Sequence, residues 1–128
     1  MLVFLVDDDD IFNTLNKTVI AYVSEAIETL SFKSGLELLN FIKESGDHFI
    51  APEIMLLDIR MPDMNCFEFL DELMLMEINP LAGTKICVLS STLDDRDLNK
   101  ALSYPVITGL IDKPLTIEKF TKIYTAAS

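Results

Sequence analysis

The sequence predicts a three-layer, doubly wound α/β fold, in which a parallel β-sheet lies between helices on its two faces. Short apolar runs that suit strands buried on both sides recur along the chain. Each run is followed by apolar residues at helical spacing, and Ser, Asn or Thr stands where an N-cap would open several of these helices. The resulting order, (βα)5, implies five parallel strands joined by right-handed crossovers.

The first half of the chain supplies three of the expected strands. Residues 2–6 and 54–57 are continuous apolar runs, and residues 26–31 form a shorter β-compatible stretch. Ser34 and Glu37 have the spacing of a capping box, with Ser at the N-cap and Glu at N3, and predict a helix before the strand at 54–57. The helix between the first two strands is predicted from apolar residues at helical spacing, namely Ile11, Leu15, Val19 and Tyr22.

The second half repeats this pattern. Asn65 and Glu68 are expected to act as N-cap and N3 of a third helix. Its apolar residues are Phe67, Leu70, Leu73 and Leu75. The remaining expected elements are a strand at 85–89, a helix at 94–103, a strand at 106–111 that Pro114 stops, and a helix capped by Thr116 that runs to about Ala126.

Length and composition indicate one domain over residues 1–128. A chain of 128 residues, half of them hydrophobic, can build a single core. Cys66 and Cys87 form no paired pattern, which favours a reducing compartment. Asp7 to Asp10 ends the first apolar run far short of a signal peptide or a membrane span. The net charge of −11 argues against nucleic-acid binding, so we expect a soluble cytoplasmic protein that binds neither membranes nor nucleic acid.

Polar side chains stand at the carboxyl ends of four of the expected strands. Asp7 and Asp8 follow the first strand, Asp58 the third, Ser90 the fourth and Lys113 the fifth. Because ligands of parallel sheets bind at the carboxyl ends of the strands, these side chains are expected to converge on one edge.

The charges of this set suggest its chemistry. Carboxylates about 4 Å apart repel by about 4 kcal/mol per pair at an effective dielectric of about 20. A hard divalent cation with oxygen ligands, such as Mg²⁺, relieves this repulsion. An incoming phosphoryl group would meet the metal, the Lys113 ammonium and the Ser90 hydroxyl, and phosphoryl transfer depends mostly on such positioning and neutralisation. A carboxylate nucleophile would give an acyl phosphate.

Each residue of the set also has a simpler interpretation. Aspartates after strands often cap the next helix, and we assign this role to Asp9 and Asp10. Ser90 alone would suit a turn, and Lys113 alone would suit a solvated surface. Their joint placement with the aspartates favours a site.

Four blocks of the sequence resemble those of response-regulator receiver domains. They are Val6-Asp7-Asp8, Leu57-Asp58-Ile59-Arg60-Met61-Pro62, Leu89-Ser90-Ser91 and Asp112-Lys113-Pro114-Leu115, in the family's order and spacing. The resemblance covers the whole chain and implies a flavodoxin-like fold with strand order 2-1-3-4-5. It implies a two-component phosphorelay domain that receives a phosphoryl group from a sensor histidine kinase or a histidine phosphotransfer protein. Such a domain signals to a downstream protein or output domain, here unknown, through a conformational change.

The resemblance also implies the roles of the acidic residues. Asp58 would be the phosphoacceptor of a signalling domain that catalyses only its own phosphorylation and dephosphorylation. Asp8, Asp58 and the main-chain carbonyl of Arg60 would bind Mg²⁺ directly, while Asp7 would act partly through water. Ser90 and Lys113 would hold the phosphoryl oxygens, and the bond between Lys113 and Pro114 would be cis.

Two positions depart from the family pattern. Leu110 stands where the family usually has an aromatic residue that moves inward when the hydroxyl residue engages phosphate, which puts the usual switch in doubt. Cys66 stands where the family has glycine, and as N1 of a helix it would need no positive φ. A thiol at a helix N-terminus can have a lowered pKa, but we prefer a packing role over a redox role.

The residues around the expected site suggest how it is modulated. The Arg60 side chain either lies over the acyl phosphate with Thr92 and limits attack by water, or faces solvent paired with a surface acid. The output surface is expected near Ser90, the fourth helix and the last strand. Its candidate residues are Thr92, Leu93, Leu98, Leu102, Tyr104 and Leu110.

Two other functions stay open. One is a receiver-like interaction module that takes no phosphate. The other is a haloacid-dehalogenase-like phosphatase, whose paired-aspartate motif Asp7-x-Asp9 superficially fits, although Ile11 replaces the expected Thr and Asp58 has no role in it. Nucleotide binding has no support, since the sequence has neither a Walker A loop nor a G-x-G-x-x-G stretch.

Overall fold

Five strands form one parallel sheet with the order β2-β1-β3-β4-β5. The computed structural model describes residues 1–61, 63–91 and 94–127. The strands are β1 (Leu2–Val6), β2 (Glu28–Phe32), β3 (Ile54–Asp58), β4 (Lys85–Ser90) and β5 (Ile107–Asp112). The helices are α1 (Asp10–Val23), α2 (Gly35–Ser45), α3 (Cys66–Met74), α4 (Asp95–Leu102) and α5 (Ile117–Ala127), with a short 3₁₀ turn, η1 (Gly46–His48). The flavodoxin-like fold and its strand order are confirmed.

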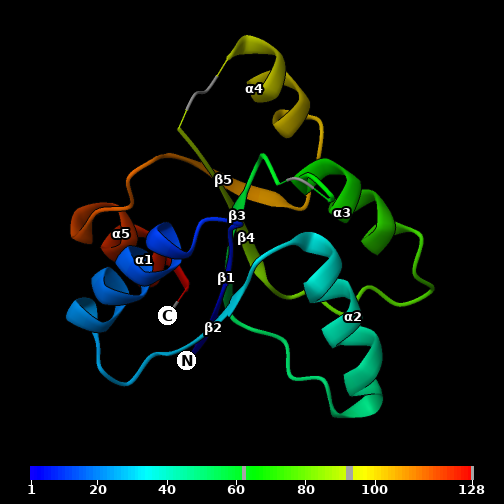
Figure 1. Ribbon diagram of the computed structural model, residues 1–128, viewed down its shortest axis with the longest axis horizontal. Helices are drawn as coiled ribbons and strands as arrows, with labels where there is room; N and C mark the ends of the chain where they lie inside the picture. Colours follow the sequence, from blue (N-terminus) through cyan, green and yellow to red (C-terminus); the bar gives the residue numbers. More distant parts are fainter. Residues whose placement is uncertain (62, 92–93, 128) are drawn as a thin grey trace.

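Helices cover both faces of the sheet, with α1 and α5 on one side and α2 and α3 on the other (Figure 1). The central strands are therefore buried on both faces, and every residue of β3 is buried. Alternate residues of β1 enter different cores: Phe4 and Val6 pack with α2 and α3, and Val3 and Leu5 pack with α1 and α5. This double burial explains why the central strands are continuous apolar runs in the sequence.

Side-chain caps begin most of the helices at the predicted places. Asn65 and Glu68 form a complete capping box at the start of α3, and the Thr116 hydroxyl accepts a hydrogen bond from the backbone N–H of Lys119. At α2 the prediction is half right. The Ser34 hydroxyl accepts from the backbone N–H of Glu37, but the Glu37 carboxylate accepts from Lys33 rather than from Ser34.

The apolar stripe used to predict α1 lies mostly outside the core. Ile11, Leu15 and Tyr22 are 69%, 52% and 76% exposed. The buried face instead carries Asn13 and Asn16 together with Ile20. Helical spacing was therefore a correct sign of the helix but did not identify its inner face. Leu75 is a similar correction: it follows α3 as its C-cap and is 79% exposed.

The boundaries of the other elements differ from the predictions by one or two residues at most ends, and η1 was not predicted. The second strand shows the largest shift, since β2 begins at Glu28 rather than at residue 26. Within the described ranges, none of the helices has both the length and the apolar composition needed to span a bilayer.

Candidate functional site

Three aspartates meet at the carboxyl ends of the two adjacent strands β1 and β3. Val6 of β1 pairs with Leu57 of β3, so the residues that follow, Asp7 and Asp58, reach the same edge of the sheet. Each of Asp7, Asp8 and Asp58 offers a carboxylate oxygen, and these three atoms lie within 4.8 Å of one another. Asp7 and Asp58 are buried, whereas Asp8 is exposed and opens the cluster to solvent.

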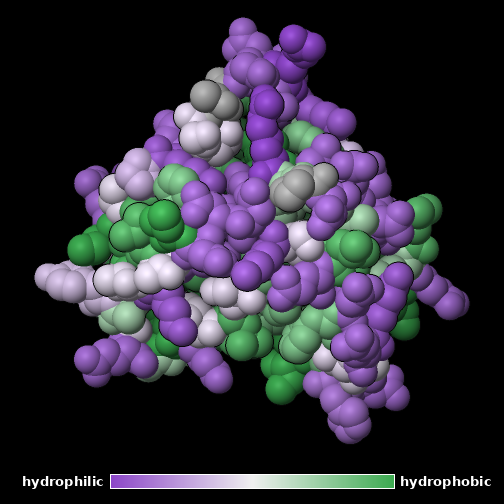
Figure 2. Space-filling model, in the orientation of Figure 1, coloured by the Kyte–Doolittle hydropathy of each residue, from purple (hydrophilic) through white to green (hydrophobic). Residues whose placement is uncertain are grey.

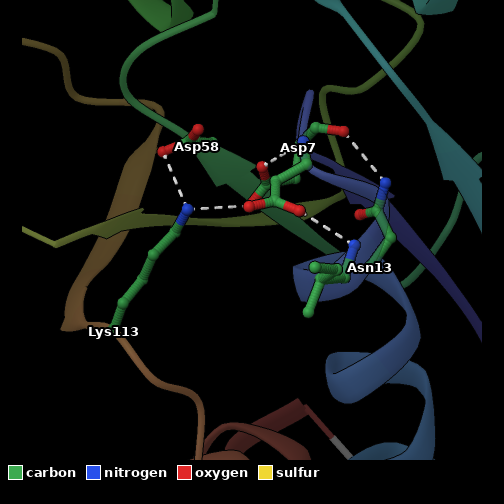
Figure 3. A network of polar contacts seen from close by, with 6 residues as sticks. Asp7, Asn13, Asp58 and Lys113 are labelled. Atoms are coloured by element: carbon green, nitrogen blue, oxygen red, sulfur yellow. Dashed lines mark hydrogen bonds and ion pairs between the residues drawn. The ribbon is translucent and has the colours of Figure 1, made fainter.

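Lys113 points into this cluster from the loop between β5 and α5 (Figure 3). Its Nζ lies 2.8 Å from Oδ2 of Asp7 and 3.4 Å from Oδ1 of Asp58, and its side chain is only 9% exposed. The Nζ also lies 4.2 Å from the centroid of the Phe12 ring, where a cation–π contact supports it. The peptide bond between Lys113 and Pro114 is cis, as the resemblance implied.

The main chain joins the Lys113 loop to the end of β4. The backbone N–H of Lys113 donates to the carbonyl of Ser90 at 2.9 Å. Ser90 is the last residue of β4 and is buried. Since β4 lies between β3 and β5, Ser90 belongs to the same edge as Asp58 and Lys113.

Burial and charge perturb both partners of the Asp58–Lys113 pair. Burial and, to a lesser extent, the charge of Asp7 raise the pKa of Asp58 from 3.8 to about 6, although Lys113 opposes both effects. Burial alone would lower the pKa of Lys113, but its hydrogen bond to Asp7 and the charge of Asp58 outweigh burial and raise it. The site therefore keeps its lysine charged and makes ionised Asp58 costly without a further cation.

The donor set suits a hard divalent cation. Three carboxylates face one ammonium, so negative charge is in excess, and oxygen atoms are the ligands that Mg²⁺ prefers. The backbone N–H of Asp9 donates to Oδ1 of Asp7, and Nδ2 of Asn13 donates to the carbonyl of Asp7. These two hydrogen bonds fix the orientation of Asp7. The Oδ1 of Asn13 is a buried acceptor with no hydrogen-bond partner among the described residues, which suits a hydrated site.

The two aspartates assigned to capping lie outside the cluster. The Asp9 carboxylate accepts from the backbone N–H of Ile11 as the N-cap of α1. Asp10 lies in the first turn of α1 and forms an exposed ion pair with Lys33. Because Asp9 serves as a cap, the Asp7-x-Asp9 pair expected of a phosphatase is not assembled.

Arg60 adopts the second of its two predicted arrangements. Its Nη2 lies 3.0 Å from Oδ2 of Asp97 and 3.7 Å from Oδ2 of Asp94, and the side chain is 67% exposed. The backbone of Arg60 has a small lowering effect on the pKa of Asp58. Thr92, the expected companion of Arg60, lies outside the described residues, as do Leu93 and Pro62. A contact between Arg60 and a phosphoryl group stays a prediction.

Cys66 is a packed residue rather than a reactive one. It is N1 of α3 and fully buried, and burial raises the pKa of its thiol to about 12. A helix N-terminus can lower the pKa of a thiol, but at Cys66 burial outweighs this effect, in line with the preferred packing role. No non-glycine residue in the described ranges has a positive φ, so Cys66 fits its position without strain.

The expected output surface contains both packed and exposed residues. Leu110 and Tyr104 are partly buried against the core, Leu98 is half-buried, and Leu102 is 71% exposed. Sequence reasoning missed two residues of the site, Asn13 and Phe12. In the sequence, Asn13 stood out only as a polar residue on the face of α1 opposite Ile11 and Leu15.

Comparison with known proteins gives consistent results. Residues 3–125 match the family described as "Response regulator receiver domain". The transcriptional regulatory protein MalR of Bacillus subtilis (strain 168) is 31% identical over 122 residues, which cover 92% of this chain and 46% of MalR. The chain thus spans about half the length of this curated relative.

Solved structures extend the comparison to the fold. The crystal structure of a two-component response regulator from Cytophaga hutchinsonii has a TM-score of 0.84 and 33% identity, and the match covers 98% of this chain and 95% of that one. A two-component response regulator from Legionella pneumophila has a TM-score of 0.82 and 26% identity, with the same coverage of 98% and 95%.

Proposed function

Because this chain belongs to the response-regulator receiver family, we propose that it accepts a phosphoryl group on Asp58 in a Mg²⁺-dependent reaction. The observation that carries the proposal is the position of Asp58, buried beside Asp7 with the Lys113 ammonium 3.4 Å from its carboxylate. The donor is a sensor histidine kinase or a histidine phosphotransfer protein, and the phosphorylated domain signals by a conformational change. We place this exchange in the cytoplasm, where the two free thiols would stay reduced.

The residues of the site have distinct tasks in the transfer. An oxygen of Asp58 attacks phosphorus while the bond between phosphorus and the donor imidazole nitrogen breaks, and the imidazole leaves. The attack needs ionised Asp58, and a pKa of about 6 leaves most of this carboxylate ionised at neutral pH. Lys113 then neutralises the oxygens of the phosphoryl group, and the Ser90 hydroxyl donates to one of them.

The acidic cluster would hold the metal ion. Asp8 and Asp58, with the carbonyl of Arg60, are the proposed direct ligands, and Asp7 acts partly through water. A bound Mg²⁺ supplies positive charge that offsets the carboxylates and the incoming phosphoryl oxygens. Lys113 alone leaves the three carboxylates with excess negative charge, so the reaction should depend on the metal.

The test is the intact mass of the purified chain after incubation with acetyl phosphate and Mg²⁺. We expect one labile phosphoryl adduct on the wild type, none when a chelator replaces Mg²⁺, and none on Asp58→Asn. Asp9→Asn is the matched control, because Asn is also a good N-cap and Asp9 lies outside the cluster. A wild type that forms no adduct would overturn the proposal in favour of the phosphate-independent interaction module.

The alternative function, a phosphatase of the haloacid-dehalogenase type, has little structural support. Its second aspartate would be Asp9, whose carboxylate caps α1. Multiple turnover of p-nitrophenyl phosphate would nevertheless be the decisive observation in its favour, and we expect none.

A further inference from the structure

Helix α4 is held to the rest of the protein by little apolar contact. Among its residues, all of which are described, only Ala101 is fully buried. Figure 1 shows α4 apart from the four other helices, at the top of the view. Figure 2 shows a hydrophilic surface over the same region. An element with few buried apolar side chains separates from its protein at low cost in free energy. The polar contacts of α4 therefore matter more than those of the other helices.

Among the described residues, the side-chain polar contacts of α4 and of the turn after it with other elements lead to α3 or to the loop that precedes it. Arg60 in this loop pairs with Asp97 in the first turn of α4 and, at longer distance, with the N-cap residue Asp94. The Nζ of Lys100 lies 4.8 Å from the centroid of the Phe67 ring in α3. Just after α4, the Tyr104 hydroxyl donates to Asp71 of α3 at 2.7 Å.

The Arg60–Asp97 ion pair differs from an ordinary surface pair in two respects. The Asp97 side chain is only 20% exposed, so solvent screens it less than a fully exposed carboxylate. Arg60 also follows the proposed phosphoacceptor Asp58 by two residues, while its guanidinium binds Asp97 of α4. One residue of the loop that follows the proposed acceptor thus holds the loosely attached helix.

Phosphorylation changes the electrostatic balance at Arg60. A phosphoryl group carries a charge of about −1.5 to −2 and offers three strong acceptor oxygens. These oxygens would appear two residues from Arg60 and compete with the Asp97 carboxylate for its guanidinium, which binds phosphoryl groups in a bidentate manner. The competition weakens the pair that joins the acceptor loop to α4.

We propose that the Arg60–Asp97 ion pair holds α4 in the unphosphorylated protein and that phosphorylation of Asp58 draws Arg60 away and loosens α4. This inference rests on the proposed function of Asp58 and adds to it the residue that transmits the change. Arg60 is a positioning residue in this scheme, since it acts on the signal through α4.

Hydrogen exchange of the α4 amides in the full chain tests the proposal. Without phosphate, we expect Asp97→Asn to speed this exchange about two- to fivefold over the wild type, the range that corresponds to a partly shielded ion pair. Asp95→Asn is the matched control, since Asp95 lies in the same first turn but forms no ion pair with the described residues. Equal exchange in Asp97→Asn and Asp95→Asn would overturn the proposal.

Phosphorylated samples test the release step. We expect acetyl phosphate and Mg²⁺ to speed α4 exchange in the wild type and to add little in Asp97→Asn, whose pair is already broken. If phosphorylation speeds α4 exchange equally in both proteins, release through this pair is overturned. The same follows if a wild type that carries the adduct shows no faster exchange, and in both cases the proposed function stays intact. A wild type without an adduct would overturn the proposed function and the release step together, while the unphosphorylated comparison would still report on the ion pair.

Discussion

The Nζ of Lys113 lies 2.8 Å from the Oδ2 of Asp7, although the two residues are 106 positions apart in the chain. Asp58 lies farther from the same nitrogen, at 3.4 Å. The ammonium therefore lies closer to Asp7, while burial and the charge of Asp7 raise the pKa of Asp58 to about 6 despite Lys113. Since one ammonium faces both carboxylates and lies closer to Asp7, ionised Asp58 needs a further cation to balance its charge.

The raised pKa predicts that Asp58→Asn stabilises the metal-free protein at neutral pH. The folded state binds a proton on Asp58 more tightly than the unfolded chain does, because the pKa rises from 3.8 to about 6. The contribution of Asp58 to the free energy of unfolding therefore falls as the pH rises from the unfolded pKa of 3.8 to the folded pKa of about 6. Above about pH 6 the folded protein bears the whole cost of burying the ionised Asp58 carboxylate. The gain in Asp58→Asn should be on the order of 2 kcal/mol above the window and should vanish below it.

Urea unfolding of both proteins across this pH range, in the presence of a chelator, measures the difference. The difference in the free energy of unfolding between the two proteins isolates Asp58, because the other carboxylates titrate over the same pH range in both. Adding Mg²⁺ should reduce or reverse the gain, since the wild type then gains binding energy that Asp58→Asn largely lacks. A gain that does not depend on pH would contradict the assignment to Asp58 ionisation.

Lys113→Met is expected to have the opposite effect. It removes the partner of two buried carboxylates, and breaking a buried ion pair from one side costs about 3 kcal/mol. Lys122→Met is the control, because Lys122 pairs with Glu118 at 3.9 Å on an exposed helix face and should contribute less than about 0.5 kcal/mol. Thermal or urea unfolding of the metal-free proteins compares them, and similar losses in the two variants would contradict the special role of Lys113.

The strands and the edge on which the site lies were predictable because both depend on local pattern. Double burial makes β1, β3 and β4 continuous apolar runs, and parallel strands bring their carboxyl ends together whatever the loops do. Asp7, Asp58 and Lys113 could thus be grouped before their distances were known.

Features that depend on the packing of one element against another were not predictable. The spacing of Ile11, Leu15 and Tyr22 defines a helix face, but the sheet selects the opposite face, where Asn13 donates to the carbonyl of Asp7. The partner of Arg60 is likewise set by where α4 lies, since Asp97 is 37 residues away in the chain. The raised pKa of Cys66 follows from burial, which outweighs the favourable position at a helix N-terminus.

Both cysteine thiols are expected to be unreactive in the folded protein. Burial raises the pKa of Cys66 to about 12 and also raises that of Cys87, and the thiolate is the reactive form. Iodoacetamide should therefore modify both residues at the rate of unfolding, and rapidly in denaturant. Fast modification of either thiol under native conditions, followed by mass spectrometry of peptides, would contradict this expectation.

Cys66→Gly is expected to destabilise the protein even though glycine is the residue that the family pattern favours here. Cys66 has ordinary helical geometry at N1 of α3, so glycine relieves no backbone strain. Glycine also raises the conformational entropy of the unfolded chain, which lowers the free energy of unfolding. The Cys66 side chain is fully buried in the core that α3 covers, so its removal also leaves a small cavity. The two effects together should cost about 1–2 kcal/mol, whereas Cys66→Ala, which keeps the Cβ, should cost less. Chemical unfolding of both variants measures this, and a Cys66→Gly protein as stable as the wild type would show that the packing of the thiol contributes little.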